Sequence, residues 1–420
     1  MTDSNRGQAD DRRLSRRTVL AGLLGGTAGP VVGYNGFLSA DEPAFAETAL
    51  ELTAEGVTIH APCGRVSDVS VSGDSNVDFK YENIPSTIVD GFELTLEANP
   101  HVADRENHQG WSEPHDSPGN IVPQEDLEGD GTENEPYKIT TDQELQAIAE
   151  ELDAHYELEI NIAASMTDQW NGGDGFEPIG DLDHPFTGSF DGNGYEICGI
   201  TIDRDDERRV GVFGFIDGLL ENVFVTHVDI TGLGEVGALV GATGDEDDMD
   251  GSTVSGVHAR GTVTGQFSVG GLVGYNHDSR PVEDSSAAVD VGTEEFDVNE
   301  GEEFVGGLVG YNSGDVIDSH ATGTVKGPND VGGLVGHSFE SGEVINSYAT
   351  GEVTADHTVG GLVGFSEGDV SGSHAEGDVT ANAVHPDDEY SAAGGLVGYK
   401  SGAAGVGTIG IADGDTVDLS

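Results

Sequence analysis

The stretch Val331-Gly332-Gly333-Leu334-Val335-Gly336 decides the fold of this chain, because versions of it recur along the second half of the sequence. Complete, variant or shortened copies begin at Val210, Val236, Val269, Val305, Val359 and Ala393. The copy at Val331 starts 26 residues after the one at Val305 and 28 residues before the one at Val359. Repeats of this length indicate supersecondary units that stack on one another.

A second phrase, Ser-x-Ala-x-Gly-x-Val, follows the full copies, as in residues 347–353. Side chains alternate along a strand, so one face is predicted to be small and mostly apolar: Ile345, Ser347, Ala349, Gly351 and Val353. The opposite face is predicted to carry Asn346, Tyr348, Thr350 and Glu352. Paired glycines would cost about 1 kcal/mol each inside a helix, which favours strands. The period-two pattern breaks at Gly332-Gly333, which we interpret as a bend with positive φ.

The sequence therefore predicts an all-β fold, a parallel β-helix in which each repeat forms about one coil. Equivalent residues would stack ~4.8 Å apart. The phrase Gly-Leu-Val-Gly and the following Ser-Tyr-Ala-Thr-Gly resemble the GLUG-motif repeat over roughly residues 136–400. That family occurs in secreted and surface-attached proteins, including adhesin-like proteins and non-catalytic parts of some large peptidases. The resemblance implies a surface scaffold and carries over no catalytic motif.

The chain is strongly acidic, with 16 Lys plus Arg, 79 Asp plus Glu and a net charge of −63. This balance resembles that of haloarchaeal-type proteins from extreme halophiles. The Debye length is ~3 Å at 1 M salt, so carboxylates on an acidic surface cease to repel one another there. The same charge argues against a nucleic-acid partner, which requires a basic patch.

Residues 1–46 resemble a twin-arginine signal peptide, with Arg16-Arg17 before an apolar stretch and Ala44-Phe45-Ala46 as the cleavage site. The apolar stretch from Val19 to Val32 is shorter than the ~20 residues that span a bilayer. We therefore expect export by the twin-arginine pathway to the cell surface or the extracellular space, without membrane insertion after signal removal.

Four further segments complete the predicted organisation. Residues 47–99 form a small β module with strands at Val57–His60, Val66–Val71, Val77–Tyr81 and Phe92–Leu96. Residues 100–135 are expected to form an acidic disordered linker. Residues 136–209 form a cap and residues 210–420 the repeat solenoid. In the cap, the Thr141-Asp142-Gln143-Glu144 capping box predicts a helix that buries Leu145, Ile148, Ala149 and Leu152. The segment Phe186–Ile197 predicts two strands joined by a tight turn.

One outward column is the candidate binding site, because position two of the second phrase is polar or aromatic in successive repeats. It holds His258, Ser286, His320, Tyr348 and His374, which we call the ridge. The binding residues predicted from it are His258, His320, Tyr348 and His374, and the partner would be a surface glycan or a protein. The alternative is a solvated surface ladder without a ligand.

Metal and cofactor signals are weak. The pattern Asp126-x-Glu128-x-Asp130 is similar to the start of a calcium loop, but Tyr137 stands where a bidentate Glu belongs. We expect no cofactor, no metal ligand set and no catalytic residue, with divalent cations on acidic loops such as 245–250 as an alternative. Cys63 and Cys198 lie in different predicted segments, which favours two small buried residues over a disulfide.

The favoured function is a structural or adhesive binding module that works in high salt. The alternative is a secreted carbohydrate-active β-helix enzyme, either a glycosidase or a lyase. A glycosidase needs two carboxylates about 5–9 Å apart, and 79 acidic residues supply such pairs by chance. A lyase needs a base beside an acidic cluster, and the few basic residues of the repeats occupy non-equivalent positions: Arg260, Arg280, Lys326 and Lys400.

Overall fold

The computed structural model describes residues 112, 114–119, 122–244, 253–277, 281–293, 303–382 and 392–401, together with the backbone of five further strands. The chain divides into two compact units, Met1–Glu106 and Asn107–Ser420. In the first unit, β1 (Ala49–Leu52) pairs in parallel with β3 (Asp68–Val71), and β2 (Val57–His60) pairs with β4 (Leu94–Glu97). The predicted signal peptide and the predicted strand Val77–Tyr81 lie outside the described residues.

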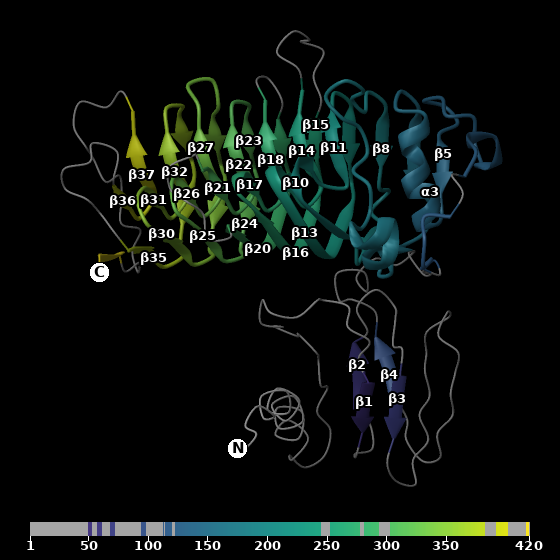
Figure 1. Ribbon diagram of the computed structural model, residues 1–420. Helices are drawn as coiled ribbons and strands as arrows, with labels where there is room; N and C mark the ends of the chain where they lie inside the picture. Colours follow the sequence, from purple (N-terminus) through teal and green to yellow (C-terminus); the bar gives the residue numbers. More distant parts are fainter. Residues whose placement is uncertain are drawn as a thin grey trace, which may run out of the picture. The chain divides into compact units, whose positions relative to one another are not determined.

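The second unit is a parallel β-helix, which confirms the predicted fold class (Figure 1). A nine-stranded sheet contains β5 (Tyr137–Ile139), β6 (His155–Leu158), β8 (Ser189–Asp191), β12 (Leu219–Glu221), β15 (Thr253–Ser255), β19 (Val282–Glu283), β23 (Val316–Ile317), β28 (Val344–Ile345) and β33 (Val370–Ser371). A seven-stranded sheet contains β11 (Phe213–Ile216), β14 (Val240–Thr243), β18 (Val273–Asn276), β22 (Val309–Asn312), β27 (Val335–Ser338), β32 (Val363–Ser366) and β37 (Val397–Lys400).

An 18-stranded sheet completes the coils. Its first half contains β7 (Ile162–Ala163), β9 (Glu196–Cys198), β10 (Thr201–Val210), β13 (Phe224–Gly237), β16 (His258–Gly265), β17 (Phe267–Gly270), β20 (Ser286–Thr293), β21 (Val305–Gly306) and β24 (His320–Ala321). Its second half contains β25 (Val325–Gly327), β26 (Val331–Gly332), β29 (Tyr348–Ala349), β30 (Val353–Ala355), β31 (Val359–Gly360), β34 (His374–Ala375), β35 (Val379–Ala381), β36 (Ala393–Gly394) and β38 (Val417–Leu419).

The register of the strands shows that one repeat makes one coil. Val305 pairs with Val331 and Val331 with Val359, so equivalent residues of successive repeats lie directly above one another. The core is a stack of these equivalent side chains. Val331, Leu334 and Val335 have no exposed surface, in agreement with the predicted core positions.

The Gly332-Gly333 corner is present, but the predicted reason for it is wrong. Neither glycine has positive φ. A Cβ on Gly333 would lie 2.1 Å from the carbonyl oxygen of Gly361 on the next coil, and one on Gly332 would lie 1.9 Å from the carbonyl oxygen of Val335. Glycine is therefore required here by the close approach of neighbouring backbone, which no side chain would permit.

A serine ladder fixes the strand that carries the ridge. The backbone N–H of Ser319 donates to Ser347 Oγ at 3.1 Å, and that of Ser347 donates to Ser373 Oγ at 3.0 Å. Each hydroxyl therefore satisfies a buried amide of the neighbouring coil. Period two holds from Ser347 to Val353, but Ile345 is only partly buried and Val344 takes its core position. Asn346, with φ of 51°, breaks the alternation between them.

The cap helix is shorter than predicted. Helix α3 spans Asp142–Ala147 and continues as the 3-10 turn η3 (Ile148–Glu150). Thr141 caps it, because its Oγ1 accepts the backbone N–H of Glu144 at 3.1 Å. Leu145 and Ile148 are fully buried as expected, whereas Ala149 is exposed because the tighter η3 rotates it away from the core.

The part of the predicted disordered linker that the structure describes, from Ser112 to residue 135, is folded. It contains the 3-10 turn η2 (Gln124–Asp126), and Gln124 Nε2 donates to the carbonyl oxygen of Ala147 at 2.9 Å. The backbone N–H of His115 donates to Asp142 Oδ2 at 2.8 Å. Periodicity could not reveal this order, because the segment is held by polar contacts with the cap and by single apolar side chains such as Leu127.

The segment Phe186–Ile197 contains two strands joined by a tight turn, as predicted. Strands β8 and β9 do not pair with each other; they lie in different sheets and pair in parallel with β12 and β13. The turn between them is a coil corner.

Strand β10, at the predicted boundary near residue 209, pairs with β13, so the cap is continuous with the solenoid. The 3-10 segment η4 (Thr167–Gly173) packs Trp170 against Phe176 there. No helix among the described residues has the length and apolar character to span a bilayer.

Candidate functional site

The structure places the predicted binding residues in one column on successive coils. Strand pairing aligns, in order, Glu196, Phe224, His258, Ser286, His320, Tyr348 and His374. His320 and Tyr348 are partly exposed and His374 is exposed, so this part of the ridge faces outward. The strands that present it are held on their inner side by the buried Ala321, Ala349 and Ala375.

Stacked rings form the C-terminal half of the ridge. The ring centroids of His320 and Tyr348 are 4.6 Å apart with an interplanar angle of 4°, and those of Tyr348 and His374 are 5.2 Å apart at 14°. Burial in this stack lowers the pKa of His320. In the N-terminal half of the ridge, His258 Nδ1 lies 2.8 Å from Ser286 Oγ. Because the ring faces cover one another, the ridge offers mainly ring edges, with their imidazole and phenol polar groups, to a partner.

A second aromatic column was missed from the sequence. Its five rings stack in register on the seven-stranded sheet: Tyr275, Tyr311, His337, Phe365 and Tyr399. Neighbouring centroids lie 4.6–5.2 Å apart. His337 Nδ1 also lies 3.0 Å from Asp330 Oδ2. The signal was present, since each of these residues directly follows a Leu-Val-Gly of the first phrase.

A shallow depression beside the first coils is lined by Lys138, Glu157, Leu158, Glu159, Asn193 and Tyr195. Lys138 forms ion pairs with both Glu157 and Glu159. Burial alone would raise the pKa of Glu157, but hydrogen bonds from Lys138 and Asn193 outweigh it and lower that pKa. A glycosidase acid needs a carboxyl whose pKa is raised. The depression therefore has the electrostatics of a structural ion-pair network.

The calcium-like pattern is used for chain geometry. Asp130 Oδ1 accepts hydrogen bonds from the backbone N–H of Thr132 at 3.1 Å and from its hydroxyl at 2.6 Å, and these bonds lower the pKa of Asp130. The backbone of Glu128 pairs with that of Lys138 in an isolated antiparallel β-bridge. The acidic loop at 245–250 lies outside the described residues, as do most of the insertions near 293–303 and 385–390.

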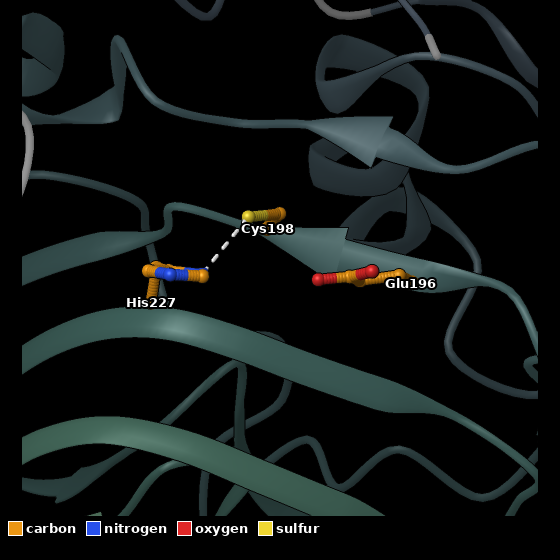
Figure 2. A group of neighbouring side chains, drawn as sticks. All are labelled: Glu196, Cys198 and His227. Carbon is orange, nitrogen blue, oxygen red and sulfur yellow. Dashed lines mark hydrogen bonds between the residues drawn. The ribbon is translucent and has the colours of Figure 1, made fainter. Parts of the chain in front are cut away.

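A buried cluster at the N-terminal end of the ridge column was also missed. Glu196 and Cys198 lie on β9, two residues apart and therefore on one face of the strand, and His227 comes from β13. Figure 2 shows the three side chains converging. One potential ligand atom from each lies within 4.8 Å of the others. Glu196 and Cys198 are 1% and 0% exposed, whereas His227 is partly exposed, so the group lies just below the surface.

A strand irregularity brings His227 into the cluster. The register of β13 against β16 shifts between Val225 and Val228, and His227 has a φ of 50°. Cys198 Sγ then lies 3.5 Å from His227 Nδ1, which is 3.2 Å from Thr226 Oγ1. The Thr226 hydroxyl in turn donates to Glu196 Oε1. These contacts make one continuous polar chain across β9 and β13.

Burial dominates the electrostatics of this cluster. It lowers the pKa of His227 to about 4, with a further contribution from the positive charge of Arg260. The imidazole is therefore neutral at neutral pH. Cys198 is disulfide-bonded, contrary to the favoured expectation of a free buried thiol. Cys63 is the only other cysteine of the sequence and lies outside the described residues.

Comparison with known proteins finds GLUG-type sequence in three consecutive repeats. The family model described as "The GLUG motif" matches residues 305–326, 327–354 and 355–380. These three segments correspond to consecutive coils of the solenoid and lie inside the range over which the sequence resembles that repeat. Each of the three matched segments contains one outward ridge residue: His320, Tyr348 and His374, in that order.

Two curated relatives share part of the chain. Halomucin of Haloquadratum walsbyi is 41% identical over 171 residues, which are 38% of this chain and 2% of that protein. The "Putative Gly-rich membrane protein" of Evansella cellulosilytica is 39% identical over 119 residues, which are 27% of this chain and 14% of that protein. The chain thus matches only a small part of the length of either relative.

The fold has a counterpart among solved structures. A crystal structure of a "putative immunoglobulin A1 protease" from Bacteroides ovatus superimposes with a TM-score of 0.51, covering 64% of this chain and 86% of that one. The two sequences are 21% identical, so the likeness concerns the fold alone.

Proposed function

We propose that this chain is an exported cell-surface or extracellular repeat protein, which acts as a structural and adhesive binding module in high salt. Three findings support it: the GLUG-type repeats, the relatives whose names denote a mucin-like and a membrane protein, and the net charge of −63. The twin-arginine pathway is the proposed export route. It rests on the sequence of residues 1–46, which lie outside the described residues.

The observation that carries the binding role is the register of the ridge. The rings of His320, Tyr348 and His374 stack on three consecutive coils, with neighbouring centroids 4.6–5.2 Å apart. The first two side chains are partly exposed and the third is exposed. A regular row of ring edges provides donors and acceptors at the spacing of the coils, which suits an extended partner. We propose a surface glycan or an extended protein segment as that partner, bound through hydrogen bonds to ring edges.

At low ionic strength, the negative charge of the chain favours a neutral partner over an anionic one. The acidic chain repels polyanions at low ionic strength, and salt screens that repulsion. A neutral polysaccharide experiences no such repulsion.

The carbohydrate-active enzyme remains the alternative function, but both carboxylates of the depression, those of Glu157 and Glu159, pair with Lys138. We therefore favour a binding module that performs no chemistry.

The test is a triple variant, His320→Ala, Tyr348→Ala and His374→Ala, on the full chain in 3 M NaCl. Binding is measured on arrays of neutral and acidic polysaccharides and on isolated cell-envelope material. The matched control replaces exposed residues on the same three coils, each directly after strand β24, β29 or β34, namely Thr322→Ala, Thr350→Ala and Glu376→Ala. We expect the ridge variant to lose at least tenfold in affinity and the control to bind as wild type.

Far-UV circular dichroism of both variants verifies that the solenoid remains folded. Equal losses in the two triple variants, or wild-type binding by the ridge variant, would assign the binding surface elsewhere on the chain.

A further inference from the structure

The cluster of Glu196, Cys198 and His227 contains the side-chain types that hold transition metals, and the binding role of the ridge does not use it. Its members come from adjacent, paired strands, so their positions are fixed by the register of the coil. All three potential ligand atoms lie within 4.8 Å of one another. Glu196 and Cys198 are buried, which shields their ligand atoms from competing water, and the partly exposed His227 leaves a side open for entry of a metal ion.

We propose that reduction of the Cys198 disulfide converts this cluster into a three-ligand site for Zn²⁺ or another borderline divalent transition metal. The ligands are the Cys198 thiolate, His227 Nδ1 and the Glu196 carboxylate. The reductant is a dithiol, which is oxidised to its own disulfide while the S–S bond of Cys198 breaks and both sulfurs take up a proton. Metal binding then releases the proton of the Cys198 thiol.

The distances fit tetrahedral zinc. Zn–S and Zn–N bonds of about 2.3 and 2.1 Å at a tetrahedral angle place the sulfur and nitrogen about 3.6 Å apart. Cys198 Sγ and His227 Nδ1 lie 3.5 Å apart. The Glu196 carboxylate lies within 4.8 Å of both atoms and has to move by about 1 Å to complete the triangle. The Thr226 hydroxyl, which donates to Glu196 Oε1, orients that carboxylate.

The ligand set selects the class of metal. One thiolate and one imidazole suit zinc and its neighbours, whereas Ca²⁺ takes six to eight oxygen ligands. The thiolate and the carboxylate together neutralise a divalent cation. The Arg260 charge, which acts on His227, opposes cation binding and limits the affinity. Three protein ligands leave a fourth position for water or for the Thr226 hydroxyl.

The disulfide and the metal are alternative states of one sulfur, because only the thiolate is a metal ligand. In the oxidised protein Cys198 is bonded to sulfur, and the site is closed to metal. In the reduced protein His227 and Glu196 are already close to their places around the thiolate. Metal affinity at this site therefore depends on redox state.

The experiment uses Co²⁺ as the probe on the full chain in 3 M NaCl. The protein is reduced with dithiothreitol, desalted without oxygen and titrated with Co²⁺. We expect a thiolate-to-cobalt charge-transfer band that saturates at one equivalent and disappears when Zn²⁺ is added. The 79 acidic residues bind Co²⁺ only through oxygen and cannot produce this band. The oxidised protein should lack it.

Variants assign the ligands. Cys198→Ser should abolish the band, and His227→Gln or Glu196→Gln should weaken Co²⁺ binding at least tenfold. His184→Gln, at a histidine that is 75% exposed, is the matched control and should bind as wild type. Absence of the band in reduced wild type would overturn the proposal, as would unchanged affinity in His227→Gln.

A second measurement needs no ligand variant. Zn²⁺ should protect Cys198 of the reduced wild type from alkylation at least tenfold, as followed by peptide mass spectrometry. Equal alkylation rates with and without Zn²⁺ would contradict the proposed site, whatever the folding behaviour of the variants.

Discussion

The close stacking of coils at the Gly-Gly corner makes Gly333→Ala the sharpest test of the solenoid. The added methyl group would lie 2.1 Å from the carbonyl oxygen of Gly361 and 2.9 Å from the Cβ of Ala349. Contacts of a real Cβ essentially never fall below 3.0 Å, so adjacent coils would have to separate by about 1 Å. The backbone N–H of Leu334 donates to the carbonyl oxygen of Leu362 at 2.8 Å, and this separation would weaken that bond.

The expected loss of stability is about 3 kcal/mol. Overpacking of a well-packed interior costs typically about 1–3 kcal/mol, and a weakened buried hydrogen bond adds about 1 kcal/mol. Gly292→Ala is the matched control. A Cβ on Gly292 would meet no atom within 4 Å, and its φ is not positive. There the methyl group should be neutral or stabilise by up to about 1 kcal/mol through the unfolded chain.

Urea unfolding in 3 M NaCl, followed by far-UV circular dichroism, measures the difference between the two variants. A loss of about 3 kcal/mol corresponds to a melting point lower by roughly 6–12 °C. Equal stabilities of Gly333→Ala and Gly292→Ala would show that the coils do not approach as closely as described. The corner would then have to depend on backbone conformation, as the sequence pattern first suggested.

Three further predictions follow from the same stacking. Deletion of residues 331–358 should leave a shorter folded solenoid, because Val305 can then pair with Val359; collapse of the β signal would contradict nearest-neighbour stacking. Burial lowers the pKa of His320 below 6.5, so His320 takes up protons more readily in the unfolded chain. The resulting stability is present above pH 6.5 and is lost as pH falls through the lower pKa of the folded state. His320→Phe should reduce the change in melting point between pH 7.5 and 5.5. The same pH dependence in the variant and the wild type would refute this. Stability should also rise from 50 mM to 3 M NaCl; a constant melting point would show that the acidic composition is not an adaptation to salt.

Much of the solenoid could be predicted, because repetition converts sequence spacing into spatial register. Ser347, Ala349 and Val353 are buried as the period-two pattern predicts, while Tyr348 between them is partly exposed. The phrase recurs at one point in each coil, so its second position forms a column. This repetition was sufficient to predict the ridge. The role of the Gly-Gly corner was misassigned because φ and close approach leave the same signature in a sequence.

The cluster of Glu196, Cys198 and His227 could not be predicted in the same way. Glu196 and Cys198 precede the first complete repeat, and their column position becomes visible only when β9 pairs with β13. His227 depends on a register shift that adds a residue between Val225 and Val228. The positive φ of His227 could not be predicted from its residue type, because histidine does not mark such a conformation in a sequence as glycine does. The fold of the segment from Ser112 was hidden for a related reason, since side-chain contacts with the cap hold it and not a periodic apolar face.

The register that builds the ridge also stacks like charges. Asp315, Glu343 and Asp369 occupy equivalent positions on successive coils, because the carbonyl groups of these residues accept the N–H groups of Val282, Val316 and Val344. Two unit charges ~4.8 Å apart repel by roughly 0.9 kcal/mol in water. A helix or a globular fold can spread such charges, whereas a solenoid repeats each face from coil to coil and adds the repulsion. At ~1 M salt the screening length of ~3 Å is shorter than the coil spacing, and most of this repulsion disappears. Uncharged positions behave differently: Ser347 above Ser373 and Tyr348 above His374 stabilise the stack at any salt concentration through hydrogen bonds and ring contacts. Salt should therefore act on the acidic columns and leave the ridge and its serine ladder unchanged.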